Sequence, residues 1–170
     1  YHIRGDGEHA LYELLKGNSN YVGINSSVWK ELDRQELSAL PKPNYSDYNF
    51  SLYAKKAMPI QGSRGCVRKC TFCDYIENWK NFQWRDADAI FNEMVSQYKT
   101  YGIRTFKFQD TLVNGNLKEF NRLIKLLAEY NLSNPAQSFK WGGFYIFRDR
   151  TNNDDWKIIA DSGADMLIVG

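Results

Sequence analysis

The sequence lacks the features of a membrane or secreted protein, because it has no long apolar run and no signal-peptide pattern at its start. It also lacks a large excess of either charge, and a net charge of +2 gives no strong attraction to nucleic acid or to an anionic membrane. Internal repeats and low-complexity tracts are missing as well. We therefore expect a soluble, cytoplasmic protein with reduced thiols, and neither nucleic acid nor a membrane as its partner.

Cysteine and histidine are both rare in this chain. Only three cysteines and two histidines occur among the 170 residues. The odd number of cysteines and their close spacing argue against a disulfide framework. A closed structural zinc site normally uses four protein ligands, and the histidines, His2 and His9, lie far upstream of the cysteines.

The composition that is present, with 43% hydrophobic and 25% charged residues, is that of an ordinary globular protein. The length suffices for one domain with a hydrophobic core and is too short for two full domains. The chain opens at Tyr1 and stops at "ADMLIVG", an apolar run that is typical of a strand cut short. We expect the chain to be a fragment of a longer protein.

The first third of the chain has a different pattern from the rest. A Gly-rich turn precedes a short helix that ends near Gly17. Residues 18–54 show weak periodicity, and Pro41 and Pro43 oppose a regular helix there. We therefore predict an extended linker in this region.

From residue 55 onward, strand and helix patterns alternate. Strands are predicted at 54–63, 103–110, 138–147 and 164–169, with helices at 86–102, 116–131 and 153–163. Gly142 and Gly143 weaken the third strand, which indicates either a bulge or the close approach of a ligand. The alternation predicts an α/β fold with parallel strands and right-handed crossovers. An open doubly wound sheet and part of a barrel both fit this pattern.

All three cysteines lie in one short stretch, "GCVRKCTFCDY", as Cys66, Cys70 and Cys73. This loop follows the first predicted strand and precedes the first helix of the alternating part, and in parallel α/β folds ligands bind at that end of the strands. Three thiolates on one loop can bind one soft metal ion or one face of an iron–sulfur cluster. Since only three cysteines are available, one metal position stays open, which is typical of a reactive centre.

The spacing C-x-x-x-C-x-x-C, with Phe72 before the last cysteine, resembles the signature of the radical S-adenosylmethionine (SAM) superfamily. The longer stretch "GSRGCVRKCTFCDY" resembles the branch in which a cobalamin-binding domain often precedes the radical SAM core. "RGDGEHALYELLKG" and "LPKPNYSDY" are similar to the tail of such a domain and its linker. "ADSGADMLIVG" is similar to the helix and fourth strand of the core.

This resemblance implies a fold and a domain division. The fold would be an incomplete parallel (β/α) barrel, TIM-barrel-like, with about four of the roughly six strand–helix units of the family. Residues 1–54 would be the tail of a preceding domain plus a linker, and residues 55–170 would be part of the radical SAM core.

The resemblance also implies an enzyme that uses a [4Fe-4S] cluster and SAM. Cys66, Cys70 and Cys73 would bind three irons, and SAM would bind the fourth. After reduction by a donor such as flavodoxin or ferredoxin, cleavage of SAM would yield a 5′-deoxyadenosyl radical that abstracts hydrogen from a substrate. The identity of the substrate stays open, and so does the use of cobalamin by the full-length protein.

The resemblance assigns two further residues to SAM binding. Phe72 would lie against the adenine, and Asp110, at the end of the second predicted strand of the alternating part, would contact the amino group. The alternative for Asp110 is that it caps a loop. For the whole site, the alternative is a non-catalytic zinc or iron–sulfur module, in which His2 or His9 could complete a zinc site.

Overall fold

A computed structural model describes residues 1–53, 57–147 and 152–169 of the chain. Its main part is a parallel sheet in the order β1-β4-β5-β6. The strands are β1 (Met58–Ile60), β4 (Thr105–Phe108), β5 (Lys140–Tyr145) and β6 (Ala164–Val169). The predicted parallel strands are thereby confirmed, although residues 54–56 of the first predicted strand lie outside the described residues.

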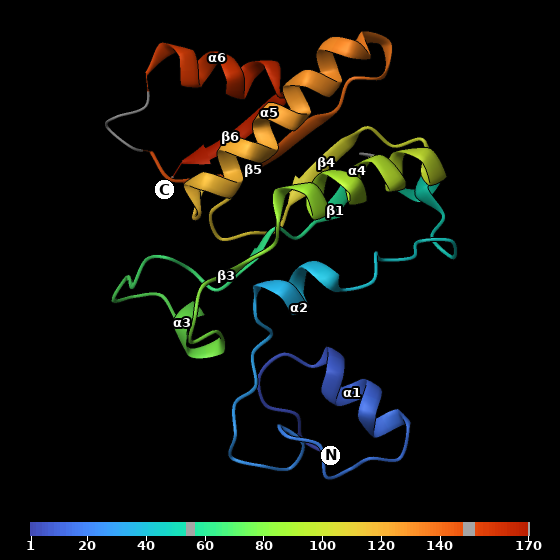
Figure 1. Cartoon of the computed structure of the whole chain (residues 1–170), viewed down its shortest axis with the longest axis vertical. Coiled ribbons are helices and arrows are strands. Elements are labelled where there is room, and N and C mark those ends of the chain that lie inside the picture. The colour runs from blue at the N-terminus through green and yellow to red at the C-terminus, as the bar shows by residue number, and fades with distance from the viewer. Residues whose placement is uncertain (54–56, 148–151, 170) are drawn as a thin grey trace.

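Helices α4 (Ala87–Tyr101), α5 (Leu117–Ser133) and α6 (Asn153–Asp161) lie side by side over one face of this sheet (Figure 1). Strand and helix side chains meet there in one hydrophobic core. The strands contribute Met58, Ile60, Phe106, Phe108 and Trp141, and the helices contribute Ile90, Met94, Phe120, Leu127 and Ile159. Full burial of such a side chain contributes about 1.5–3 kcal/mol, so this core is the main source of stability. Single 3-10 turns occur at Phe50–Leu52 and Pro135–Gln137.

The other face of the sheet carries the alternate side chains of each strand. Phe144, Met166 and Ile168 are exposed on that face by 47%, 49% and 37%. Lys107 of β4 is also exposed, and it lies opposite Gly142 of β5. The described residues therefore bury one face of the sheet and leave a partly apolar face open. No described helix is long and apolar enough to cross a membrane.

The glycines of β5 are explained by packing. The pairing of β5 with β6 contains a bulge between Trp141 and Gly142. A Cβ atom on Gly142 would lie 2.8 Å from the carbonyl oxygen of Met166, and one on Gly143 would lie 2.6 Å from Cγ1 of Val113. Of the two explanations offered by the sequence, the bulge is therefore confirmed.

The N-terminal third contains α1 (Glu8–Leu15), as predicted, and α2 (Arg34–Ala39), which was not predicted. Asp33 and Glu36 form a capping box with reciprocal hydrogen bonds, which gives this short helix a defined start. The expectation of an extended linker throughout residues 18–54 was wrong for α2, whereas the chain between α1 and α2 and most of that range after Ala39 are irregular. Figure 1 shows α1 at the end of the molecule that is remote from the sheet.

Candidate functional site

The cysteine loop, which we define as residues 65–82, projects from a short antiparallel base. This base consists of β2 (Ser63–Arg64) and β3 (Gln83–Trp84). Gly65 has φ +79°, and a Cβ atom there would overlap the carbonyl oxygen of Asn81. The two arms of the loop approach closely because residue 65 is glycine. Strands of two residues are too short for periodicity to reveal, so the sequence pattern did not predict this base.

The three cysteines lie on this loop ahead of α3 (Tyr75–Asn78), and all are free thiols. Cys66 is partly exposed, while Cys70 and Cys73 are exposed. The backbone N–H of Arg68 donates to Sγ of Cys66 at 3.4 Å, and the N–H of Cys73 donates to the carbonyl oxygen of Cys70 at 3.1 Å. In the part of the chain that the structure describes, no three Cys, His, Asp or Glu side chains are grouped as a metal site.

The chemistry of the donor set nevertheless fits an iron–sulfur cluster. Three soft thiol ligands come from one short loop, and their exposure lets them turn toward a bound group. The N–H that reaches Sγ of Cys66 is of the kind that tunes cluster potentials. Arg68 and Lys69, which lie between the first two cysteines, can offset the negative charge of the thiolates.

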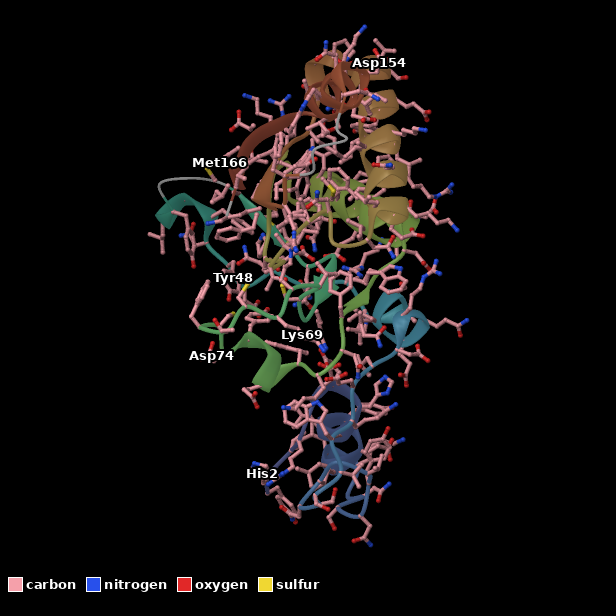
Figure 2. The ribbon with its side chains drawn as sticks, turned by 90° about the vertical axis from the view of Figure 1, so that its left-hand side faces the viewer. His2, Tyr48, Lys69, Asp74, Asp154 and Met166 are labelled. Atoms are coloured by element: carbon pink, nitrogen blue, oxygen red, sulfur yellow. The ribbon has the colours of Figure 1, made fainter. Side chains whose placement is uncertain are left out.

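The aromatic residues of the cysteine loop differ in their surroundings. Phe72 is 91% exposed, so its ring is available to a ligand. Tyr75 and Trp79 instead stack on each other, with ring centroids 4.9 Å apart. Figure 2 shows Lys69 and Asp74 of this loop between the sheet and the first residues of the chain.

Neither histidine is grouped with the cysteines among the described residues. Nδ1 of His9 lies 3.7 Å from Oε1 of Glu36, on α2. His2 lies at the opposite end of the molecule from the sheet, beyond Lys69 and Asp74 (Figure 2). The alternative zinc site therefore gains no fourth ligand from a histidine in this structure.

Asp110 follows β4 and is buried, with 3% exposure. Its carboxylate accepts hydrogen bonds from the backbone N–H of Gly62 at 3.0 Å and from the hydroxyl of Ser63 at 2.5 Å. Burial raises the pKa of Asp110 to about 6, and these hydrogen bonds oppose the shift. Asp110 thus joins the end of β4 to the base of the cysteine loop, which is the behaviour of a loop-capping residue.

Further contacts support the loop base, and no pattern in the sequence predicted them. The hydroxyl of Thr111 donates to the carbonyl oxygen of Gly65 at 2.7 Å. Nη2 of Arg85 lies 2.7 Å from Oε2 of Glu93, with side-chain exposures of 8% and 3%. Nη1 of Arg85 also donates to the carbonyl oxygen of Gln61 at 2.9 Å. This buried ion pair therefore links α4 to the segment between β1 and β2.

No family model matches the chain, but individual proteins do. The anaerobic magnesium-protoporphyrin IX monomethyl ester cyclase of Synechocystis is 25% identical over 147 residues, covering 77% of this chain and 30% of that protein. The bacteriochlorophyllide d C-12(1)-methyltransferase of Chlorobaculum tepidum is 27% identical over 156 residues, covering 88% of this chain and 33% of that protein. The cytidylyl-2-hydroxyethylphosphonate methyltransferase of Streptomyces wedmorensis is 24% identical over 144 residues, covering 76% of this chain and 26% of that protein. The chain thus spans about a third of the length of these relatives.

A solved structure has a similar fold. The radical S-adenosylmethionine methyltransferase TsrM of Kitasatospora setae, with tryptophan and a SAM analogue bound, matches with a TM-score of 0.74 and 16% identity. The match covers 99% of this chain and 36% of that one. A second structure of TsrM, with cobalamin and a [4Fe-4S] cluster bound, matches with a TM-score of 0.58 over 67% of this chain and 20% of that one, at 16% identity. These comparisons bear out the resemblance that the cysteine loop predicted: the chain is similar in sequence to a cyclase and two methyltransferases, and similar in fold to a radical SAM methyltransferase.

Proposed function

We propose, on the premise of this relationship, that the cysteine loop binds a [4Fe-4S] cluster and SAM. The observation that carries the proposal is the set of three free thiols, Cys66, Cys70 and Cys73, on one loop that follows the first strand of a parallel sheet. Three protein ligands leave one iron of the cluster for another molecule. The amino and carboxylate groups of SAM can occupy that position together.

The residues of the loop have separate tasks in this proposal. The three cysteines hold three irons, and Phe72, with 91% exposure, is available to lie against the adenine of SAM. When bound, a reduced cluster together with SAM would supply the chemistry of reductive SAM cleavage and of hydrogen abstraction from a substrate by a 5′-deoxyadenosyl radical. The chain itself supplies ligation and orientation of these groups.

Asp110 has two tasks in the proposed site. Its two carboxylate oxygens accept hydrogen bonds from Gly62 and Ser63, which supports the loop base. An ionised carboxylate offers about four lone-pair positions, so it retains acceptor capacity for the amino group of SAM. We therefore propose Asp110 as a SAM contact that also caps the loop.

The open face of the sheet suggests how the fold continues. We propose that residues 55–170 form part of a (β/α) barrel, with Phe144 and Met166 on its inner side. Apolar side chains of this size are commonly exposed where a ligand or another part of the protein covers them. Residues 1–54 are then the tail of a preceding domain and a linker.

The proposed reaction is limited to the SAM chemistry that the cysteine loop implies. The relatives include methyltransferases and a cyclase, so we propose SAM cleavage followed by chemistry on a substrate of unspecified class. An electron donor such as flavodoxin or ferredoxin is part of the proposal. Because TsrM has been solved with cobalamin bound, cobalamin is a candidate second cofactor.

Anaerobic reconstitution of the chain with iron and sulfide tests this function. We expect about one [4Fe-4S] cluster per chain and a change in the electron paramagnetic resonance spectrum of the reduced cluster when SAM is added. A reduced cluster whose spectrum is insensitive to SAM would contradict the open iron position. A colourless protein that binds zinc instead would favour the non-catalytic module.

A further inference from the structure

One segment at the start of the chain contacts the cysteine loop at both of its ends. We call residues 1–33 the N-terminal segment. It contains α1, and isolated bridges join Ile3 to Ile24 and Gly5 to Lys30. Figure 2 shows this segment, marked by His2, on the side of the loop that faces away from the sheet.

At the first end of the loop, two acids of the N-terminal segment enclose Arg64. Nη1 of Arg64 lies 2.8 Å from Oδ1 of Asp6, and the guanidinium also donates to the carboxylate of Glu8. The side chains of Arg64 and Asp6 are only 12% and 6% exposed. Burial would raise the pKa of Glu8, but the hydrogen bond and charge of Arg64 hold that pKa below its usual value. Loss of either acid would remove one of the two counter-charges of a poorly hydrated guanidinium.

Asp6 is itself held in place by further contacts. Its Oδ2 accepts the backbone N–H of Leu32 at 2.7 Å, and Leu32 is 1% exposed. The indole N–H of Trp79 lies 3.4 Å from Oδ1 of Asp6. Since Trp79 belongs to the loop, Asp6 contacts both the strand that leads into the loop and the residues after α3.

At the second end of the loop, Glu31 accepts hydrogen bonds from two successive residues. The backbone N–H of Lys80 donates to its Oε1 at 2.6 Å, and Nδ2 of Asn81 donates to its Oε2 at 2.8 Å. The indole N–H of Trp29 also donates to Oε1 of Glu31, at 3.0 Å. Nζ of Lys80 lies 5.7 Å from the ring centroid of Trp29, which adds a cation–π contact.

The loop base is too short to hold the loop without such help. It pairs Ser63 with Trp84 and Arg64 with Gln83, and an isolated two-stranded ribbon is marginally stable at best in water. The Asp110 contacts hold it from the side of β4, and the N-terminal segment holds it from the other side. Arg64 is two residues before Cys66, so the position of that thiol depends directly on where Arg64 is held.

We propose that Asp6, Glu8 and Glu31 are positioning residues, which act through Arg64, Lys80 and Asn81 to fix both ends of the cysteine loop. The effect falls mainly on Cys66, because Cys70 and Cys73 are exposed and lie farther along the loop from Arg64. This inference rests on the proposed function, since the position of the thiols matters to catalysis only if they are ligands. The order of the loop can nevertheless be measured without a cluster.

The test compares Asp6→Asn and Glu31→Gln with a matched control, Asp88→Asn. Asp88 also pairs with an arginine, Arg122, but that pair is on α4 and α5 and its side chains are 53% and 55% exposed. Cluster-free chain is treated with iodoacetamide, and alkylation of each cysteine is followed by mass spectrometry beside amide hydrogen exchange. We expect Cys66 to react about tenfold faster in both variants than in the control, with faster exchange confined to residues 65–82.

Two results would overturn the proposal. One is alkylation of Cys66 at the same rate in the variants and the control. The other is faster exchange throughout α4, α5 and the sheet, which would make these acids general contributors to stability. Reconstituted samples give a separate reading, in which we expect a broader electron paramagnetic resonance spectrum in both variants. A chain that assembles no cluster at all would refute the proposed function while leaving the loop measurements valid.

Discussion

The hydroxyl of Ser63 donates a hydrogen bond to the carboxylate of Asp110 at 2.5 Å, across 47 positions of the sequence. Ser63 begins the base of the cysteine loop, and Asp110 follows β4 with only Gln109 between them. With 3% exposure, Asp110 has lost its hydration and depends on its partners within the chain. The protonation of one buried carboxyl group is therefore coupled to the base of the candidate site.

We expect the cluster-free chain to become more stable as the pH is lowered from 7 to 5. Burial raises the pKa of Asp110 from its usual value of 3.8 to about 6, so between these values the folded chain binds a proton that the unfolded chain does not. The stabilisation begins as pH falls through 6, is complete below 3.8, and amounts to at most about 3 kcal/mol. Urea unfolding of the chain and of Asp110→Asn at pH 7 and pH 5 measures this change in the free energy of unfolding. Equal pH dependence of the two proteins would contradict the prediction.

Asp110→Asn also separates the two tasks proposed for this residue. The amide keeps an acceptor for the loop base but removes the charge that would face the amino group of SAM. We expect normal iron and sulfide content and a SAM affinity that is lower by about ten- to a hundredfold, as for the loss of a charge-assisted hydrogen bond. Titration of the reconstituted protein with SAM measures the effect. An unchanged affinity would restrict Asp110 to supporting the loop.

Replacement of any one of Cys66, Cys70 or Cys73 by alanine should abolish stable cluster binding. Two remaining thiols leave two irons of the cluster without a protein ligand, and the cluster would be lost or degraded. Iron and sulfide content and visible absorption after anaerobic reconstitution report the result. Thr71→Ala, in the same exposed stretch, is the control and should retain its cluster. Full iron content in a variant that lacks one cysteine would remove that residue from the ligand set.

Glu93→Gln should destabilise the chain strongly. Glu93 and Arg85 are 3% and 8% exposed, so the change leaves a buried guanidinium without its counter-charge, at a cost of about 3–5 kcal/mol. Asp88→Asn breaks an exposed pair with Arg122, which water already screens, and should cost far less stability than Glu93→Gln. Denaturant unfolding of both variants gives their free energies of unfolding. Similar losses of stability in the two would show that burial does not determine how much the Arg85–Glu93 pair stabilises the chain.

The open face of β5 and β6 should promote self-association of the chain. Met166 and Ile168 are 49% and 37% exposed there, beside Phe144 of β5, and they form a contiguous apolar surface. Met166→Lys should lower the apparent mass in a concentration series followed by light scattering. Leu132→Lys, which removes a single exposed apolar residue near the end of α5, should have no effect. A chain that is monomeric at all concentrations would contradict the prediction.

Local patterns in the sequence were sufficient to predict the main elements and the candidate ligands. Helices α4, α5 and α6 and strands β4, β5 and β6 all coincide with predicted segments, because side-chain periodicity reports which face of a segment is buried. The spacing of Cys66, Cys70 and Cys73 identified the candidate loop as well. Residues so close in sequence lie near one another in any fold, so their grouping can be seen without the tertiary structure. Helix α2 was missed because the prolines after it dominated the pattern.

How the loop is held was decided only by the tertiary structure. Glu8 lies 56 positions from Arg64, and Glu31 lies 49 positions from Lys80, yet these contacts fix the two ends of the loop. In the sequence, such acids look like ordinary surface charges. Their effect depends on which of them lose water and face a partner when distant segments meet, and a linear pattern of residue types does not contain that information.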